Sequence, residues 1–317
     1  MPTDPLVAAW LAYLETTQRH GVATRKAYAN DMALLKAQHP QSCLDTLQHT
    51  DIRHSLAQLK AQGYNPRSLG RTLSAWRSFY QWRLTLKKIS ENPVQDIRAP
   101  KVPRPLPRAL SVDQMQGLLD SAQHHAMHKP VALRDQAMFE LFYSCGLRLA
   151  ELVSLDHKYV REPGYESVSW LDMSQAQVVV RGKGQKERLL PVGSKAMDAL
   201  SVWLGLRNQW PQHATPEAKA ALFLGTRGGR IAPRIVHEQL KRMAYQANLP
   251  VHLHPHVLRH SFASHLLQSS QDIRAVQELL GHSTIRTTQI YTGLDFQHLA
   301  KVYDQAHPRA TRRRNSE

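Results

Sequence analysis

Residues 99–107 read Ala-Pro-Lys-Val-Pro-Arg-Pro-Leu-Pro, with four prolines in nine residues. Such a run cannot continue a helix, because proline lacks the backbone N–H and fixes φ, and it favours an extended, semi-rigid linker. The run therefore predicts a domain boundary. We expect a first domain over residues 1–95, a linker over 96–108, a second domain over 109–304 and a basic tail over 305–317.

The composition agrees with two folded domains. The chain has 317 residues, 42% of them hydrophobic, which is enough for each domain to bury a core. No apolar run approaches the ~18 residues that a membrane span needs. The N-terminus shows no secretory signal, so we expect a cytoplasmic protein. Cys43 and Cys145 fit no metal spacing, and we expect reduced thiols whose role is packing.

The charge points to a polyanionic partner. Lys and Arg number 41 against 25 Asp and Glu, a net charge of +16. Residues 1–107 hold 15 basic and 7 acidic side chains and the remainder holds 26 and 18, so each part carries +8. Nucleic acid that touches both domains would explain this balance. The alternative is a basic protein whose charged faces are merely solvated.

The first domain is predicted to be helical, because apolar residues recur there at the spacing of one helix face. They are Val7, Trp10, Leu11 and Leu14, then Leu69, Leu73, Trp76 and Tyr80. Arg71, Arg77 and Arg83 are interleaved with the second set. These arginines either meet phosphates or are solvated on the outer face of a core helix.

The second domain is predicted to be mixed but mainly helical. A helix is expected over 130–145, ended by Gly146, and another from Ser111. Val-Val-Val at 178–180 and Arg-Leu-Leu at 188–190 flank Gly-Lys-Gly, which indicates a β-hairpin with a basic tip. Residues 205–220 are expected to be irregular.

The C-terminal part of this domain is expected to continue in helices. Asp272 should cap a helix that Gly281 ends, and a short helix should carry Tyr291. A last helix should carry the apolar stripe Leu299, Val302 and Tyr303. The predicted fold class is therefore mainly α with a small β-hairpin or sheet.

Residues 252–291 concentrate groups that suit phosphodiester chemistry. The segment holds His256-Val-Leu-Arg259-His260, then Gly-His282, then Tyr291. The transition state needs fixed donors, for which the planar guanidinium is best, a proton acceptor and a nucleophile. A zinc site at His256 and His260 is disfavoured, because no HExxH glutamate and no nearby cysteine accompany them.

Two further residues have plain alternatives when taken singly. Arg148 could be an ordinary arginine at the start of a helix, and Lys183 a solvated lysine in a turn. The Gly182-Lys183-Gly184 tip is not a P-loop, because the required glycine spacing and the following Ser or Thr are absent.

Taken together and in order, these motifs resemble the tyrosine recombinase (phage integrase) family. The resemblance covers nearly the whole chain and implies a two-domain, C-shaped DNA clamp, with an N-terminal helical core-binding (SAM-like) domain and a catalytic domain. It implies an active site without metal or cofactor, in which Tyr291 is the nucleophile. By the resemblance the active-site residues are Arg148, Lys183, His256, Arg259, His282 and Tyr291. His260 is then expected to be structural and Glu151 to pair or cap locally.

Residues 143–152, 182–191 and 294–309 resemble more closely the family members that resolve chromosome dimers at cell division. This implies a specific double-stranded DNA site, a sister recombinase in a heterotetrameric synapse and a division-linked DNA translocase. The last helix would then dock on a neighbouring protomer, whereas packing on its own core is the alternative.

Three other functions remain open at this point. A mobile-element integrase of the same family would often carry an extra arm-binding domain, and none is visible. A non-catalytic DNA-binding regulator would not need six ordered catalytic groups. A metal-dependent nuclease would need clustered carboxylates. His252, His254 and His265 receive no role.

Overall fold

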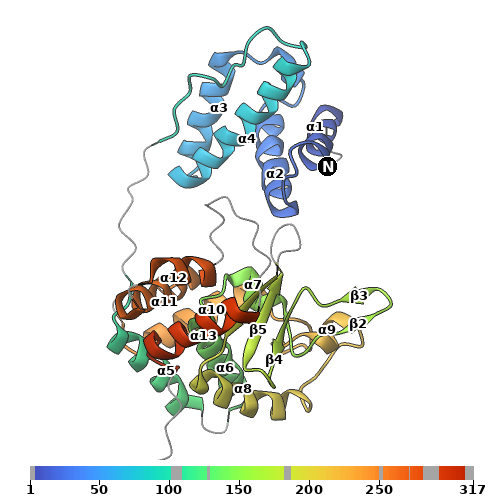
Figure 1. Ribbon diagram of the computed structural model, residues 1–317. Helices are drawn as coiled ribbons and strands as arrows, with labels where there is room; N and C mark the ends of the chain where they lie inside the picture. Colours follow the sequence, from blue (N-terminus) through green and yellow to red (C-terminus); the bar gives the residue numbers. More distant parts are fainter. Residues whose placement is uncertain are drawn as a thin grey trace, which may run out of the picture. The chain divides into compact units, whose positions relative to one another are not determined.

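The structure is a computed structural model that describes residues 4–100, 109–126, 129–181, 187–249, 253–270, 272–280 and 293–310. The chain divides into two compact units, Met1–Pro105 and Leu106–Glu317, which we call unit 1 and unit 2. Unit 1 is helical and unit 2 combines helices with a small sheet (Figure 1). The predicted fold class, mainly α with a small sheet, is confirmed.

Unit 1 packs its helices around one apolar core. The helices are α1 (Pro5–Thr16), α2 (Val22–Gln38), α3 (His49–Ala61) and α4 (Pro66–Thr85), with a short 3-10 turn at Leu44–Thr46. Trp10 of α1 and Phe79 of α4 are fully buried. Their rings pack edge to face, with 5.6 Å between the ring centroids. The helix faces predicted from the apolar spacing are thus the faces that build the core.

Asp31 on α2 connects this core to α4. Its carboxylate is fully buried and accepts hydrogen bonds from the Arg71 guanidinium at 2.9 Å and the Thr72 hydroxyl at 2.9 Å. Its backbone carbonyl accepts from the Trp76 indole at 2.8 Å. A buried carboxylate persists only when it is paired in this way, so Arg71 serves the fold.

The other two interleaved arginines of α4 also have partners inside unit 1. Arg77 donates to the carbonyl oxygen of Ile97 at 2.8 Å. Arg83 is buried and forms an ion pair with Asp45. All three arginines have protein partners inside unit 1, but the Arg71 side chain is also 49% exposed, so contact with phosphates and solvation both remain open for this helix.

Unit 2 is built around helix α6 (Pro130–Cys145), which is buried without a break from Ala137 to Cys145. It packs against α5 (Val112–Ala126), α8 (Ser194–Arg207) and α11 (Pro255–Ser270). Ser111 and Gln114 bond each other reciprocally at the start of α5, and Asp272 accepts from the backbone N–H of Ala275 in α12 (Ile273–Leu280). The predicted starts of both helices are confirmed.

One sheet carries the hairpin of unit 2, and its strands run in the order β1–β4–β5–β6. The strands are β1 (Leu155–Asp156), β4 (Ser169–Asp172), β5 (Gln177–Arg181) and β6 (Glu187–Pro191). β1 and β4 are parallel and the other pairs are antiparallel. A separate pair, β2 (Arg161–Glu162) and β3 (Tyr165–Glu166), projects to one side (Figure 1). The predicted strands flanking the Gly-Lys-Gly tip are confirmed, and the tip lies outside the described residues.

Helices α7 (Leu149–Ser154), α9 (Pro216–Ala220), α10 (Pro233–Gln246) and α13 (Gly293–Ala306) complete the unit. The prediction that residues 205–220 are irregular is confirmed for 208–215 and wrong at both ends, because α8 extends to Arg207 and α9 begins at Pro216. The hydroxyl of Thr215 accepts from the backbone N–H of Ala218, and Pro216 suits the first helical position.

The two cysteines differ in their surroundings. Cys145 is buried, and burial raises the pKa of its thiol to about 12, which agrees with a packing role. Cys43 is exposed, so the expected packing role was wrong for this residue. The next residue, Leu44, begins the 3-10 turn, and its side chain is buried.

Candidate active site

Arg148 lies where helix α6 gives way to helix α7. α6 ends at Gly146, whose φ of 55° lies in the left-handed region that glycine adopts without a Cβ penalty. A Cβ at this position would also lie 2.2 Å from the ring of Phe262. Both constraints require glycine here. The turn that Gly146 allows brings Arg148 to the N-cap position of α7.

Glu151, in the first turn of α7, binds Arg148 twice. Oε2 of Glu151 accepts from the backbone N–H of Arg148 at 2.7 Å, and Oε1 accepts from Nη1 at 2.8 Å. Burial acts to raise the pKa of Glu151, but the charge of Arg188 and the hydrogen bonds from Arg148 outweigh it, and the pKa lies below its ordinary value. The carboxylate is therefore ionised at neutral pH. The prediction that Glu151 pairs and caps locally is confirmed.

Arg259 reaches the same place from helix α11. Its Nη1 donates to the carbonyl of Gly146 at 2.6 Å, and its Nη2 donates to the carbonyl of Leu280 at 2.5 Å. Leu280 is the last residue of α12, where carbonyls lack an intrahelical partner. Burial and the nearby charge of Arg148 lower the pKa of Arg259 to about 10, so it remains cationic at neutral pH.

The two arginines differ in access. The Arg148 side chain is 46% exposed, whereas that of Arg259 is 12% exposed and is held from behind by two backbone carbonyls. Nη1 of Arg259 lies 3.9 Å from Oε2 of Glu151, so both guanidiniums border one carboxylate. Two planar cations around one anion leave a net positive site that can bind a phosphodiester.

His256 lies three residues before Arg259, in the first turn of α11, and is exposed. Side chains three apart in a helix share a face, so His256 and Arg259 lie on one side of α11. His254 is also exposed, with its ring 6.1 Å from that of His256. His260 is exposed as well, and its expected structural role stays a prediction.

Lys183, His282 and Tyr291, together with His252 and the short helix expected around Tyr291, lie outside the described residues. Two described features border them in the chain. Arg181 and Glu187 are register partners on β5 and β6, on either side of residues 182–186. Leu280, whose carbonyl accepts from Arg259, precedes His282 by two residues.

Within the described ranges, no group of three or more His, Cys, Asp or Glu side chains is placed to hold a metal ion. In the same part of the chain, no helix is long and apolar enough to cross a membrane.

Comparison with protein families matches both units. The model of the Phage integrase family matches residues 108–298, which is more than half of the chain. The chain belongs to the phage integrase family. The model of the phage integrase N-terminal SAM-like domain matches residues 7–87 of the same chain. The family predicted from the order of the motifs is thereby confirmed.

Curated members of this family resemble the chain over nearly its whole length. Tyrosine recombinase XerC 1 of Ralstonia nicotianae is 50% identical over 98% of this chain and 96% of its own. Tyrosine recombinase XerC of Azotobacter vinelandii is 49% identical over 97% of each chain. As a member of this family, the chain is a site-specific DNA recombinase, an enzyme that acts through a covalent protein–DNA intermediate.

Solved structures share the fold of this family member. XerH recombinase bound to a palindromic difH substrate has a TM-score of 0.64 at 20% identity, covering 94% of this chain and 84% of that chain. The Tn1549 transposon integrase in complex with circular intermediate DNA has a TM-score of 0.66 at 17% identity, covering 92% and 98%.

Sequence reasoning missed two polar groups in unit 2 of this recombinase. Arg188 on β6 donates from Nη2 to Oε2 of Glu151 at 2.9 Å. In the sequence, only its position could have marked Arg188, as a charged residue directly before Leu189 and Leu190 of the predicted strand. His265 is buried, donates from Nε2 to the carbonyl of Leu110 at 2.7 Å and accepts from the Tyr143 hydroxyl at 2.8 Å. No local pattern marks His265, because its partners are far away in the sequence.

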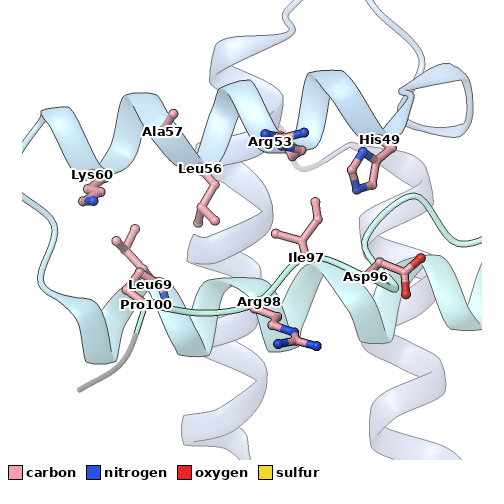
Figure 2. A pocket seen from close by; sticks show the side chains of 10 residues that line it. All are labelled: His49, Arg53, Leu56, Ala57, Lys60, Leu69, Asp96, Ile97, Arg98 and Pro100. Carbon is pink, nitrogen blue, oxygen red and sulfur yellow. The ribbon is translucent and has the colours of Figure 1, made fainter. Parts of the chain in front are cut away.

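A separate hollow of about 600 Å³ lies within unit 1. Figure 2 shows it between helix α3 and the segment that ends unit 1. Leu56, Leu69 and Ile97 supply apolar walls. Its charged or titratable lining residues are His49, Arg53, Lys60, Asp96 and Arg98. The excess of cations over one carboxylate gives this hollow a positive rim.

Proposed function

We propose that this chain is a XerC-type recombinase that cuts and rejoins double-stranded DNA at a dif-type site. A XerD-type recombinase is its partner in a heterotetrameric synapse, and the reaction resolves chromosome dimers at cell division. An FtsK-like, division-linked DNA translocase acts on the same synapse. Recombination takes place in the cytoplasm, where the chromosome lies. The identity of about half of all residues with curated XerC recombinases over nearly the full length supports this proposal.

The observation that carries the chemistry is the pair Arg148 and Arg259 around Glu151. Two guanidiniums from helices far apart in sequence converge on one spot, and Arg259 is fixed by two backbone carbonyls. Such preorganised donors stabilise the charge that develops on the non-bridging oxygens of a phosphodiester, each by a few kcal/mol in a water-poor site. We assign to them the clamp on the scissile phosphate, with His282 as a further donor.

Covalent cleavage then needs two electron-pair transfers and two proton transfers. The Tyr291 oxygen attacks phosphorus, and its proton passes to His256. The P–O5′ bond breaks, and Lys183 gives a proton to the leaving 5′-oxygen. The products are a 3′-phosphotyrosyl link and a free 5′-hydroxyl. The ordinary pKa of tyrosine is about 10, so a cationic site is needed to favour the attacking phenolate.

Rejoining reverses the same transfers. A 5′-hydroxyl of the partner duplex attacks the phosphotyrosyl phosphorus, and the tyrosine oxygen leaves. One phosphoester bond is formed for each one broken in both steps, so the bond energy is retained in the covalent intermediate. The proposed cycle therefore needs no ATP, metal or other cofactor.

Covalent trapping on a nicked dif-type duplex, with and without XerD, tests the proposal. The nick lets a short fragment diffuse away after cleavage, so the protein–DNA adduct accumulates and is read on a denaturing gel. The wild-type chain should form the adduct, and Tyr291→Phe should not, while duplex binding stays nearly intact. Tyr245→Phe is the matched control, because Tyr245 is 84% exposed on α10. An adduct formed by Tyr291→Phe would exclude Tyr291 as the nucleophile.

A further inference from the structure

Arg188 approaches the arginine pair from the sheet. It stands on β6 opposite Val180 of β5, and its side chain is 11% exposed. Its Nη2 donates at 2.9 Å to Oε2 of Glu151, the carboxylate oxygen that also accepts from the backbone N–H of Arg148. β6 packs against α12, whose last carbonyl holds Arg259. Arg188 therefore links the sheet to both arginines of the site.

We propose that Arg188 is a positioning residue that acts through Glu151 to keep Arg148 and Arg259 in place for the phosphodiester. The inference rests on the phosphate-binding role proposed for the arginine pair. Arg188 itself need not touch DNA, since its head is turned to the carboxylate and most of its surface is buried.

Competition for Oε2 of Glu151 is the first argument. Nη1 of Arg259 lies 3.9 Å from this oxygen and donates instead to the Gly146 carbonyl at 2.6 Å. Without Arg188, Oε2 would lose its buried cationic partner and would attract Arg259. That shift would take Arg259 away from Gly146 and neutralise a charge that the phosphodiester needs.

The charge balance is the second argument. Glu151 faces three guanidiniums, those of Arg148, Arg188 and Arg259, among the residues that the structure describes. With Arg188 present the cluster keeps two net positive charges, whereas without it a single net charge remains. The charge of Arg188 also helps to hold the pKa of Glu151 below its ordinary value, and so keeps the carboxylate in the ionised form that binds Arg148.

An unpaired donor is the third argument. Nε of Arg188 is buried and has no hydrogen-bond partner within the described ranges. Buried polar atoms are normally paired, so an unpaired one needs an explanation. The side chain is thus held for its contact with Glu151 rather than for complete pairing of its own donors.

The neighbouring strand offers a matched control. Arg181 on β5 also pairs with two glutamates, Glu166 and Glu187, but its side chain is 26% exposed, and within the described part of the chain neither of these partners is Glu151. Arg181→Met removes the same charge from the same hairpin as Arg188→Met does. It should leave cleavage close to the wild-type rate.

A double-mutant cycle tests the inference. The rate of adduct formation on the nicked dif-type duplex is measured for the wild type, Arg188→Met, Glu151→Gln and the double variant. If Arg188 acts through Glu151, Arg188→Met slows cleavage about tenfold or more in the wild-type chain and has little further effect in Glu151→Gln. Arg188→Lys, which keeps the charge, should recover part of the rate. Urea unfolding of each variant shows that it is folded under the assay conditions.

Each result decides the matter. An equal slowing by Arg188→Met in both backgrounds would overturn the inference while leaving the proposed function intact. Equal slowing by Arg188→Met and Arg181→Met would also overturn it, because a general decrease in positive charge would then suffice. If Arg188→Met unfolds, Arg188→Lys in the two backgrounds replaces it in the cycle. Failure of the wild-type chain to form any adduct would refute the proposed function, and the inference with it.

Discussion

The hydroxyl oxygens of Tyr303 and Ser144 lie 2.6 Å apart in the core of unit 2, and this contact ties helix α13 to the end of helix α6. Ser144 Oγ also accepts from the backbone N–H of Gly193 at 2.9 Å. Leu299 and Tyr303 are 3% and 1% exposed. In the structure the last helix, α13, therefore packs on the core of its own unit, the alternative to docking on a neighbouring protomer.

This contact predicts the effect of Tyr303→Phe. The change keeps the buried ring and removes one hydroxyl, so the free energy of unfolding should fall by about 1 kcal/mol. Urea denaturation checks the value, with Tyr245→Phe at the surface as the control. If α13 docked on a neighbouring protomer in solution, the unfolding midpoint would change with protein concentration. A concentration-dependent midpoint would therefore contradict packing within one chain.

His307 predicts a pH dependence of stability. It is 3% exposed, its ring is stacked on Tyr303 at 4.7 Å, and burial followed by the charge of His265 lowers its pKa to about 3. Below about pH 6.5 His307 is protonated in the unfolded chain but stays neutral in the folded chain. The free energy of unfolding therefore falls as the pH falls from about 6.5 towards 3. The contribution of His307 is complete above about pH 6.5.

The expected slope is about 1.4 kcal/mol per pH unit from this one group. His307→Phe keeps an aromatic ring in the stack and removes the titration. Free energies of unfolding measured from pH 7 to pH 4 should therefore differ in slope between the wild type and this variant by about that amount. Identical slopes would show that His307 takes up its proton in the folded state as readily as in the unfolded chain.

Local signals determined much of the predicted fold. Gly146 ends α6 as predicted because its left-handed backbone and the ring of Phe262 both exclude a side chain, and Asp272 caps α12 with a hydrogen bond three residues away. The strands at 178–180 and 188–190 followed from Val-Val-Val and Arg-Leu-Leu on either side of a glycine-rich sequence. Such features are decided within a few residues, so one sequence suffices to find them.

Long-range polar contacts could not be predicted in the same way. Arg188 and Glu151 are 37 residues apart, and Tyr143 and His265 are 122 apart. Their pairing depends on how the sheet and helices pack, which no periodicity encodes. The short helix α9 was missed because five residues are too few to show a period. The order of the site motifs led to the family, and the family led to the six catalytic assignments that remain proposals.

The proposed role of Lys183 as the acid for the leaving group predicts a selective rescue. Lys183→Ala should cleave an ordinary dif-type duplex slowly, because the 5′-oxygen then leaves without a proton. A 5′-bridging phosphorothioate leaves as a stable thiolate and needs no acid, so this substrate should restore the rate of adduct formation. Arg259→Ala is the comparison, because removal of the phosphate clamp should slow both substrates. Equal slowing of both substrates by Lys183→Ala would argue against an acid role.

Binding of the whole chain to DNA should weaken steeply with salt, because each phosphate that the protein neutralises releases condensed counterions. The slope of log K against log salt is negative, and its magnitude decreases by about 0.9 for each phosphate that a variant no longer neutralises. Arg53 and Lys60 are exposed on the positive rim of the hollow in unit 1, so Arg53→Gln with Lys60→Gln should reduce the slope by up to about 1.8. Lys87→Gln with Lys88→Gln removes the same charge from exposed positions outside the hollow, and should change the slope less. Equal changes in the two double variants, measured by fluorescence anisotropy from low to high salt, would mean that DNA responds to the net charge of unit 1 rather than to this rim.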